Sequence, residues 1–432
     1  MKVKNEIELR EALASGEKTI ELVSSIQLME TIKLGPGQKL VAGEKDILLS
    51  FIQTDGVALS GDNEIQGLAI QTRPDRRAIY IDSLLEDLGD IGLRDLTLTG
   101  MVQLMTRGKN KTLSIWVDGL DIVSADARAY PQRPMKYGVV VHQGAFTVYN
   151  FNPREGSHIS FHGENISLGR KNAPVLGSGL FISGFNDQAG PVTVEKLTTG
   201  AIYSNGMVPP GQPNLITGAI FIVYGVHAKD ILSKGEVTSY GTNDMVLDVW
   251  GQVDQWVTKK EVTSYGPSGI GFVNFGRVKN FKAEEAIKTY GLGARGFNQY
   301  DGTIEKAQFK RIETKGDGSI GMQFSKAVGE IKVLEGISTQ GSTGQTLVKG
   351  VIKELQADAI SVLEGGSIKK LSILGDLVVG GQEVVAYHVD GGRVDRLEFQ
   401  GQIKRDQEGS KALLIENGGQ SDLKDLEEYI NK

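Results

Sequence analysis

The sequence contains no cysteine among its 432 residues. The chain therefore forms no disulfide, uses no thiolate nucleophile and ligates no metal through sulfur, and its redox compartment is left undecided. Proline is scarce, with 11 residues, whereas glycine is abundant, with 56. Because this glycine does not follow collagen's period of three, its abundance indicates a chain that turns often.

Long apolar runs and strong net charge are also missing. No apolar run reaches the length of a membrane span, so no membrane insertion is expected. A formal charge of -6 without a basic cluster argues against nucleic acid as a partner. The first residues, "MKVKNEIELREALASGEK", show no apolar core of a signal peptide. The default expectation is a cytoplasmic protein; a virion protein and a trimmed secreted protein are the alternatives.

What the sequence does contain is an internal repeat. The segment "EVTSY" occurs at 236–240 and again at 261–265, 25 residues later. Three columns of similar residues extend this spacing: one of branched aliphatics, one of hydroxyl side chains and one of glycines. They are Val237, Val262, Ile287, Ile312, Ile337 and Val362; Ser239, Ser264, Thr289, Thr314 and Thr339; and Gly241, Gly266, Gly291, Gly316, Gly341 and Gly366.

Short β-branched segments bounded by glycine at a fixed period predict an all-β fold, a parallel β-helix. Its coils would stack about 4.8 Å apart, so identical positions would lie above one another. The aliphatic and hydroxyl columns would point inward and the glycines would form a corner. Asn274 and Gln299 are expected to stack inside as an amide ladder. About a dozen rungs are expected, with the period clearest in 237–366.

The whole chain, 1–432, is predicted to be one β-helix domain. A cap at 1–20 contains a helix from Glu6 to Ala14, and a cap at 401–432 contains a helix over 421–432 with Ser421 as its N-cap. Caps are needed because both ends of a β-helix expose unpaired backbone. Between them, rungs with loop insertions span 21–250 and regular rungs span 251–400.

The segment "ELREALASGEKTIELVSSIQLMETIKLGPGQKLVAG" (8–43) resembles the beginning of proteins in the pectate-lyase-like superfamily. The resemblance implies a right-handed, single-stranded parallel β-helix and a carbohydrate ligand. Members include polysaccharide lyases, glycoside hydrolases, sugar epimerases, phage tailspikes and adhesins. The polygalacturonase residue set is missing, and Trp116-Val117-Asp118-Gly119 has glycine where the pectate lyase stretch has histidine. Neither of these two activities is therefore carried over.

An insertion at 124–136 carries Arg128, Arg133 and Lys136, and His142 follows it closely. Lyase or epimerase chemistry on a uronic acid needs a cation that neutralises the carboxylate and a base for the α-proton. Arg133, Lys136 and His142 supply these residue types. The alternative is a solvated surface loop.

A second family of strands places His142 and Asp248 at equivalent positions, and both would line one wall if that column faces outward. Their separation would be roughly 14 Å. Asp248 is then a candidate acid, and a two-carboxylate mechanism would need a partner from elsewhere, such as Asp187 or Asp254.

Aromatic residues also recur in columns. Strand alternation turns Tyr240 and Tyr265 outward, and Tyr224 and Trp250 belong to a second column. Exposed rings suit the apolar faces of sugars, and the loop 203–216, with Tyr203 and Asn205, could wall a cleft beside them. The alternative is that the rings pack under a loop or in an interface, for example of a homotrimer.

The predicted function is that of a carbohydrate-active protein, a polysaccharide lyase or uronic-acid epimerase acting on an acidic polysaccharide. The alternatives are a non-enzymatic structural or adhesion protein of the tailspike kind, and a glycoside hydrolase. No cofactor is expected. A calcium ion held by Asp and Glu stays open, although no calcium-loop spacing is present.

Overall fold

The computed structural model describes residues 1–134, 136–209, 211–212, 214–348 and 351–429. Strands make up 57% of it and helices 4%, and long parallel sheets dominate. The chain is therefore all-β, and its architecture is compatible with the predicted parallel β-helix. Its contacts divide it into two compact units, each described by itself. Unit 1 is Met1–Tyr137, Val141–Ser204 and Phe221–Ile231; unit 2 is Gly138–Val140, Asn205–Ile220 and Leu232–Lys432.

Unit 1 begins with the predicted helix, α1 (Glu6–Ala14). The Asn5 side chain caps it by accepting a hydrogen bond of 2.9 Å from the Glu8 backbone N–H. Leu9 and Ala12 are its buried residues, so the helix packs on the first strands through one face. The prediction of an N-terminal helix at these residues is confirmed.

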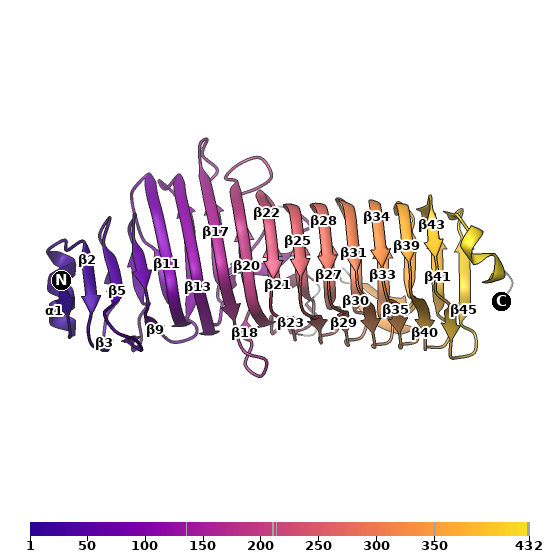
Figure 1. Cartoon of the computed structure of the whole chain (residues 1–432), viewed down its shortest axis with the longest axis horizontal. Coiled ribbons are helices and arrows are strands. Elements are labelled where there is room, and N and C mark those ends of the chain that lie inside the picture. Colours follow the sequence, from indigo (N-terminus) through magenta and orange to yellow (C-terminus); the bar gives the residue numbers. More distant parts are fainter. Residues whose placement is uncertain (135, 210, 213, 349–350, 430–432) are drawn as a thin grey trace. The chain divides into compact units, whose positions relative to one another are not determined.

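Parallel strands of unit 1 lie side by side after this helix (Figure 1). One series consists of β1 (Lys2–Val3), β2 (Thr19–Leu22), β5 (Lys39–Ala42), β8 (Glu64–Gln66), β11 (Asp87–Thr99), β13 (Thr112–Ser124), β17 (His158–Leu168) and β20 (Val192–Asn205), with β3 (Ile26–Leu28), β6 (Leu48–Phe51), β9 (Ala69–Gln71) and β18 (Val175–Leu176) beside them. A second sheet contains β4 (Ile32–Lys33), β7 (Val57–Leu59), β10 (Arg77–Ile81), β12 (Met101–Arg107), β16 (Gly144–Phe151) and β19 (Ser178–Ser183).

Alternation along these strands separates core from surface. Leu40, Ile65, Leu93 and Val117 pair in register on β5, β8, β11 and β13, and all four are fully buried. Because successive side chains of a strand point to opposite faces, the residues between them point outward. This alternation brings Trp116 to the surface.

Unit 2 carries the repeat recognised in the sequence. One sheet is built from β23 (Val237–Ser239), β25 (Gln252–Thr258), β26 (Val262–Ser264), β28 (Arg277–Ala283), β29 (Ile287–Thr289), β31 (Thr303–Phe309), β32 (Ile312–Thr314), β34 (Ala327–Val333), β35 (Gly336–Thr339), β39 (Ser367–Ile373), β40 (Asp376–Val379), β42 (Arg393–Val394), β43 (Leu397–Phe399), β44 (Ile403–Arg405) and β46 (Gln420–Ser421). The other contains β24 (Asp244–Val249), β27 (Ile270–Asn274), β30 (Arg295–Gln299), β33 (Ile320–Phe324), β38 (Ile360–Leu363), β41 (Val385–Asp390) and β45 (Lys411–Glu416). Strands β15 (Val140–His142), β20, β21 (Leu215–Ile222) and β22 (Val226–Ser233) have residues in both units.

The aliphatic and hydroxyl columns pair as predicted from 237 to 339. Val262 pairs with Val237 and with Ile287, and Ser264 pairs with Ser239 and Thr289. These side chains are all buried. The amide ladder is also confirmed, because Asn274 Nδ2 donates to Gln299 Oε1 at 3.2 Å.

The last step of the predicted columns is wrong. Ile337 pairs with Leu377, whereas Val362 pairs with Phe324 on the other sheet. An antiparallel hairpin, β36 (Gly344–Val348) and β37 (Val351–Leu355), is inserted between the two rungs and shifts the spacing. The rungs after 341 are therefore less regular than the sequence suggested, and Gly366 does not continue the glycine column.

The glycine column is a corner where consecutive coils touch through their backbones. A Cβ atom added at Gly266, Gly291, Gly316 or Gly341 would lie about 2 Å from the carbonyl oxygen of the preceding glycine. After the hairpin, Gly381 takes the next place, 1.9 Å from the Gly341 oxygen by the same measure. Glycine is required here by space rather than by backbone torsion.

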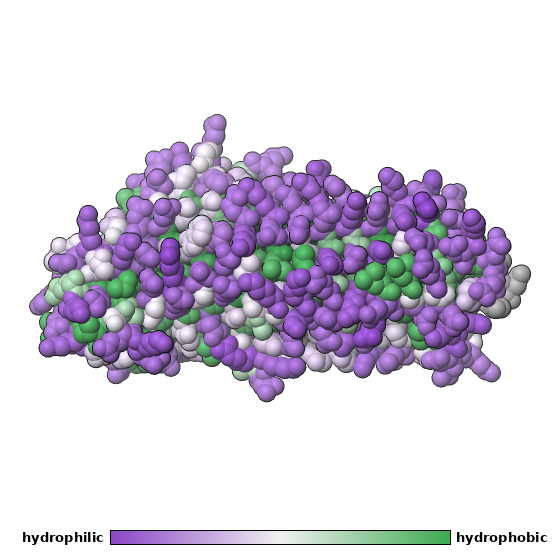
Figure 2. Space-filling model, viewed as in Figure 1, coloured by the Kyte–Doolittle hydropathy of each residue, from purple (hydrophilic) through white to green (hydrophobic). Residues whose placement is uncertain are grey.

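The turns that follow neighbouring strands carry opposite charges. Lys259 bonds to Glu284 and Lys310 bonds to Glu285, each at 2.8 Å. Figure 2 shows that hydrophilic side chains dominate the viewed face of the molecule. Each exposed pair contributes little to stability, but a register slip would break many of them at once.

The C-terminus differs from the predicted helical cap. A 3-10 helix, η1, spans Lys424–Tyr429, and Ser421 belongs to β46. The Asp422 side chain accepts a hydrogen bond from the Lys424 N–H at 3.2 Å, so Asp422 takes the capping place that Ser421 was expected to fill. Residues 430–432 of the predicted helix lie outside the described residues.

Candidate functional site

The predicted basic insertion forms a small ribbon in unit 1. Strand β14 (Pro131–Gln132) pairs antiparallel with β15, and Pro131 lies opposite His142. Arg133 and Lys136 continue from β14 into solvent, and Lys136 forms an ion pair with Asp187. His142, in contrast, is only 8% exposed. The ribbon places Arg133 two residues after Pro131, the partner of His142, but Arg133 and Lys136 are exposed whereas His142 is buried.

The charges of Asp126 and Arg128 both act on His142. Burial lowers the pKa of His142, the positive charge of Arg128 lowers it further, and Asp126 acts in the opposite direction. The imidazole is therefore neutral near pH 7, and its Nδ1 atom has no hydrogen-bond partner within the described part of the chain. A neutral imidazole can act as a base, but His142 is buried and could do so only for a group that comes into contact with it.

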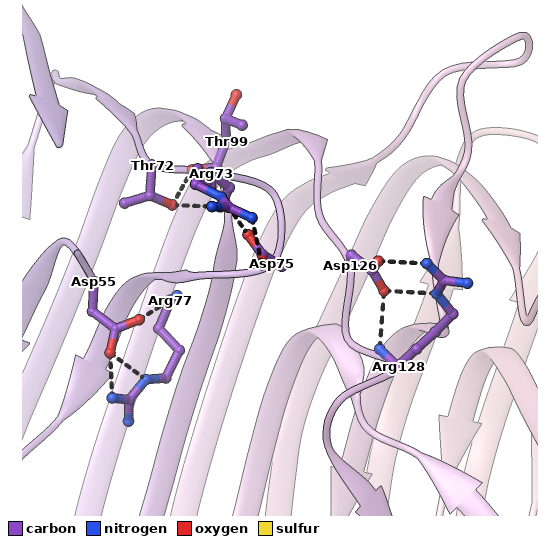
Figure 3. Close-up of polar contacts among 8 residues, drawn as sticks. All are labelled: Asp55, Thr72, Arg73, Asp75, Arg77, Thr99, Asp126 and Arg128. Atoms are coloured by element: carbon purple, nitrogen blue, oxygen red, sulfur yellow. Dashed lines mark hydrogen bonds and ion pairs between the residues drawn. The ribbon is translucent and has the colours of Figure 1, made fainter. Parts of the chain in front are cut away.

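Two arginines of this part of unit 1, Arg128 and Arg73, are already paired with carboxylates (Figure 3). Arg128 donates through Nε and Nη2 to both oxygens of Asp126, at 2.9 and 2.7 Å. Arg73 pairs in the same way with Asp75. Because these guanidinium charges are neutralised locally, they are poorly placed to neutralise a uronate.

Arg77 completes this edge of unit 1. It pairs with Asp55 through its side chain and its backbone N–H, and its guanidinium carbon lies 3.7 Å from the centre of the Tyr80 ring. The bond to Asp55 and the ring contact both hold the guanidinium in place. The edge is a set of structural ion pairs that order the loops between strands.

Asp248 is fully buried in unit 2, so the expectation of an acid on an open wall is wrong for this residue. Its two carboxylate oxygens have no hydrogen bond of ordinary geometry among the described residues. Burial raises the pKa of Asp248 well above its usual range, and the Trp250 side chain acts in the opposite direction. The carboxyl is therefore held protonated inside the protein.

Asp244, on the same strand, is also fully buried but has three donors. It accepts hydrogen bonds from the backbone N–H groups of Gly206 and Gly241 and from the Thr217 hydroxyl. Burial raises the pKa of Asp244 to about 6, although these donors favour its charged form. Asp244 therefore links the chain segments that carry Gly206, Thr217 and Gly241.

The predicted sugar-binding residues of the loop and the second aromatic column do not form an open wall. Tyr224 and Trp250 are 4% and 3% exposed, so neither offers a ring face to solvent. Asn205 is partly exposed, but its Oδ1 accepts a hydrogen bond from the Met207 N–H. Tyr203 is half-buried.

The first aromatic column is a stack of parallel rings. Tyr265 lies between Tyr240, at 5.2 Å, and Tyr290, at 4.8 Å. Tyr265 is 42% exposed, but each of its faces is covered by a neighbouring ring. It presents an edge and a hydroxyl rather than a face, and this limits the use of Tyr240 and Tyr265 as sugar platforms.

An exposed ring face exists elsewhere in unit 1, at Trp116 on β13. Trp116 is 49% exposed, and one face of its indole stacks on His162, with 3.9 Å between ring centres and 4° between planes. His162 is itself fixed by a 2.9 Å contact with Glu164, which also bonds to Lys196 at 2.9 Å. Three neighbouring side chains therefore hold the indole in one orientation.

The other side of Trp116 borders a groove. In register, Trp116 pairs with Gly92 on β11, and Gly92 pairs with Glu64 on β8. Because glycine has no side chain, the outward place above β11 is empty. The strands of Glu64 and Trp116, on either side of β11, lie about 10 Å apart. The resulting groove has a volume of about 350 Å³. Its lining residues are Lys39, Asp62, Asn63, Glu64, Asp90, Ile91, Gly92, Arg94, Ser114 and Trp116.

Gly92 is not required by its backbone conformation. Its φ lies outside the left-handed region, and the atom nearest to an added Cβ would be Cγ of the Glu64 side chain, at 3.3 Å. Glycine inside a long strand weakens it and often marks the close approach of a ligand. The glycine therefore leaves an open place beside Trp116 that its own backbone conformation does not require.

The groove is lined by hydrogen-bonding groups of both signs. Glu64 contacts Lys39 at 2.7 Å and Arg94 at 3.4 Å, so these charges largely compensate one another. The lining contains three carboxylates and two cations, and its net charge is close to neutral. Such a surface suits a ligand with many hydroxyls and no strong charge.

No group of three or more His, Asp or Glu side chains capable of holding a metal occurs within the described ranges. Helices long and apolar enough to cross a membrane are likewise absent from the described part of the chain.

A comparison of the sequence and the structure with protein-family models, curated proteins and solved structures finds no match.

Unit 2 contains one further cluster of titratable groups. His388 on β41 contacts Asp358 through Nδ1 at 2.8 Å and Glu416 through Nε2 at 3.1 Å. Burial lowers the pKa of His388, but the two carboxylates raise it more, and the net shift is upward. The cluster joins β41 to residues of the rungs on either side.

A pH dependence of stability follows from this pairing. The raised pKa of His388 means that its contribution is complete below the unfolded value of about 6.5 and is lost as pH rises through the folded pKa. We expect wild type to lose stability over this range relative to His388→Gln. Urea unfolding of both proteins on either side of neutrality measures the difference, and parallel pH profiles would contradict it.

Proposed function

We propose that the protein binds saccharides, with one sugar ring lying in the groove of unit 1 against the free face of Trp116. The observation that carries this proposal is the exposed indole, held against His162 on one side and facing the empty place at Gly92 on the other. Sugar rings combine apolar C–H faces with a belt of hydroxyls. An aromatic face bordered by polar groups complements both features.

The charge of the groove favours a neutral sugar. A uronate entering it would meet Asp62, Glu64 and Asp90, while Lys39 and Arg94 already face Glu64. Hydroxyls, in contrast, can donate to these carboxylates and accept from the cations. The acidic polysaccharide predicted from the sequence therefore fits this groove less well than a neutral one.

At the level of the fold, we propose a right-handed parallel β-helix of the pectate-lyase-like kind. The parallel strands, the stacked columns and the N-terminal helix support it. This class fits saccharide binding, because long solenoids offer extended surfaces to polymers. A structural or adhesion protein that recognises a glycan is favoured over an enzyme by one specific observation: Arg128, the arginine whose charge acts on His142, is neutralised by Asp126.

The lyase prediction for Arg133, Lys136 and His142 has a direct assay. Elimination at a uronic acid forms an unsaturated product that absorbs ultraviolet light. Steady formation of this product by wild type, and its loss in His142→Ala, would favour the enzyme. Saccharide binding without product from any uronic-acid polymer would favour the binding protein.

Replacing Trp116 by alanine is expected to weaken saccharide binding at least about tenfold, because the substitution removes the stacking face. Isothermal titration calorimetry with a panel of neutral oligosaccharides measures the change. Tyr265→Ala is the matched control, since it removes an exposed ring whose faces are already covered. Equal affinities of Trp116→Ala and wild type would contradict the proposal.

A further inference from the structure

Arg295, on β30 of unit 2, is a buried cation without a carboxylate partner. Its side chain is 8% exposed. Nε donates to Gln323 Oε1 at 2.8 Å, and Nη1 donates to the Gly293 carbonyl at 3.3 Å. Among the described residues, no carboxylate pairs with the guanidinium and Nη2 makes no hydrogen bond. Burial alone lowers the pKa of Arg295, to about 10.

A second buried group beside it lacks a partner as well. Asn298 is 2% exposed, and its Oδ1 has no hydrogen bond in the described structure. Asn298 pairs in register with Gln323, the residue that accepts from Arg295. Paired residues of parallel strands point the same way, so Asn298 and Gln323 share one face of the sheet. The hydrogen bond from Nε brings the Arg295 guanidinium to the Gln323 side chain on that face.

The neighbours of Arg295 along the sheet are apolar. Ile270 and Ile320 flank Arg295 in register on the neighbouring strands, and both are buried. The hairpin strand β36 is fixed nearby, because Thr346 hydrogen-bonds to Ser268 at 2.9 Å and lies against Gly293. In such surroundings an uncompensated charge and an unmet acceptor each carry a large cost.

We propose that Arg295, Asn298 and Gln323 form a binding site for a small hydroxycarboxylate. The carboxylate accepts hydrogen bonds from the terminal nitrogens of Arg295, and the adjacent hydroxyl donates to Asn298 Oδ1. Gln323 holds the guanidinium in position through its Nε contact. This ligand satisfies both unmet groups at once, whereas a simple cation satisfies only the amide oxygen and a neutral apolar molecule satisfies neither.

Three small probes separate the two contacts at matched ionic strength. Glycolate has both a carboxylate and a hydroxyl, acetate lacks the hydroxyl, and glycolamide lacks the charge. Binding to wild type, followed by calorimetry and by the shift of the thermal midpoint, should be tightest for glycolate, weaker for acetate and undetectable for glycolamide.

Arg295→Met should weaken glycolate binding at least about tenfold, the loss expected for a charged hydrogen bond. Lys306→Met, which removes an exposed cation of the same unit, should leave it unchanged. Glycolate binding that is equal in wild type and Arg295→Met, or no saturable binding to wild type, would overturn the proposal.

Asn298→Asp provides a second variant that does not depend on the tolerance of the fold for methionine. It places a carboxylate of nearly the same shape beside Arg295. The variant should have a higher thermal midpoint than wild type without any ligand, and it should no longer respond to glycolate. An unchanged glycolate response in this variant would also overturn the site.

Discussion

Gly291→Ala is expected to destabilise the protein by about 3 kcal/mol or more, although it adds a single methyl group. The added Cβ atom would lie 2.0 Å from the carbonyl oxygen of Gly266 and 2.3 Å from its carbonyl carbon. Both atoms belong to the backbone of the coil below, so no side-chain rotation relieves the overlap. The coils would have to separate, and the strand pairing of Ile287 with Val262 would weaken with them.

Gly380→Ala is the matched control for this effect. A Cβ atom at Gly380 would meet its nearest atoms at 3.5 Å, an ordinary contact distance. This variant should be neutral, or more stable by about 0.4–1 kcal/mol, because alanine restricts the unfolded chain. Urea unfolding of both variants measures the difference, and equal stabilities would show that the glycine corner is not a backbone contact.

Gly92→Val is expected to have the opposite profile: the fold is retained and saccharide binding is lost. Valine favours strands, and the atoms nearest to an added Cβ belong to the Glu64 side chain. Its methyl groups would occupy the empty place beside Trp116, where the sugar ring is proposed to lie. Affinity should fall to below detection in calorimetry, while the thermal midpoint stays the same or rises.

Gly92→Ala should have an intermediate effect on affinity, since its single methyl group fills less of the groove. The graded series of glycine, alanine and valine distinguishes a filled groove from a distorted strand. A distorted strand would lower the thermal midpoint together with the affinity. Wild-type affinity in Gly92→Val would place the sugar elsewhere.

The repeat could be predicted where each rung has the same length. The columns from Val237 to Ile337 follow directly from strands of three to seven residues that recur at the same spacing in each rung. The step to Val362 failed because a hairpin of apolar and charged residues, 344–355, has no glycine-rich or proline-rich signature that distinguishes it from another rung. A repeat of 25 residues in the sequence does not reveal where a hairpin is inserted between two rungs.

The candidate site was less accessible to sequence reasoning. Alternation in "LSIWVDG" places Ile115 and Val117 inside and Trp116 outside, so its exposure could have been predicted. The empty place opposite it depends on the pairing of Trp116 with Gly92, which the irregular spacing of unit 1 conceals. The burial of Asp248 and Trp250 was missed for a related reason: alternation assigns a face to a side chain but does not tell whether that face is covered.

Tryptophan fluorescence tests the central claim most directly, because the three tryptophans differ sharply in exposure. Trp116 is 49% exposed, whereas Trp250 and Trp256 are 3% and 0% exposed. Titration with neutral oligosaccharides should produce a saturable change in wild type that is absent from Trp116→Phe. If no oligosaccharide produced such a change, or if Trp116→Phe showed the wild-type change in full, the groove beside Trp116 would not be a saccharide site.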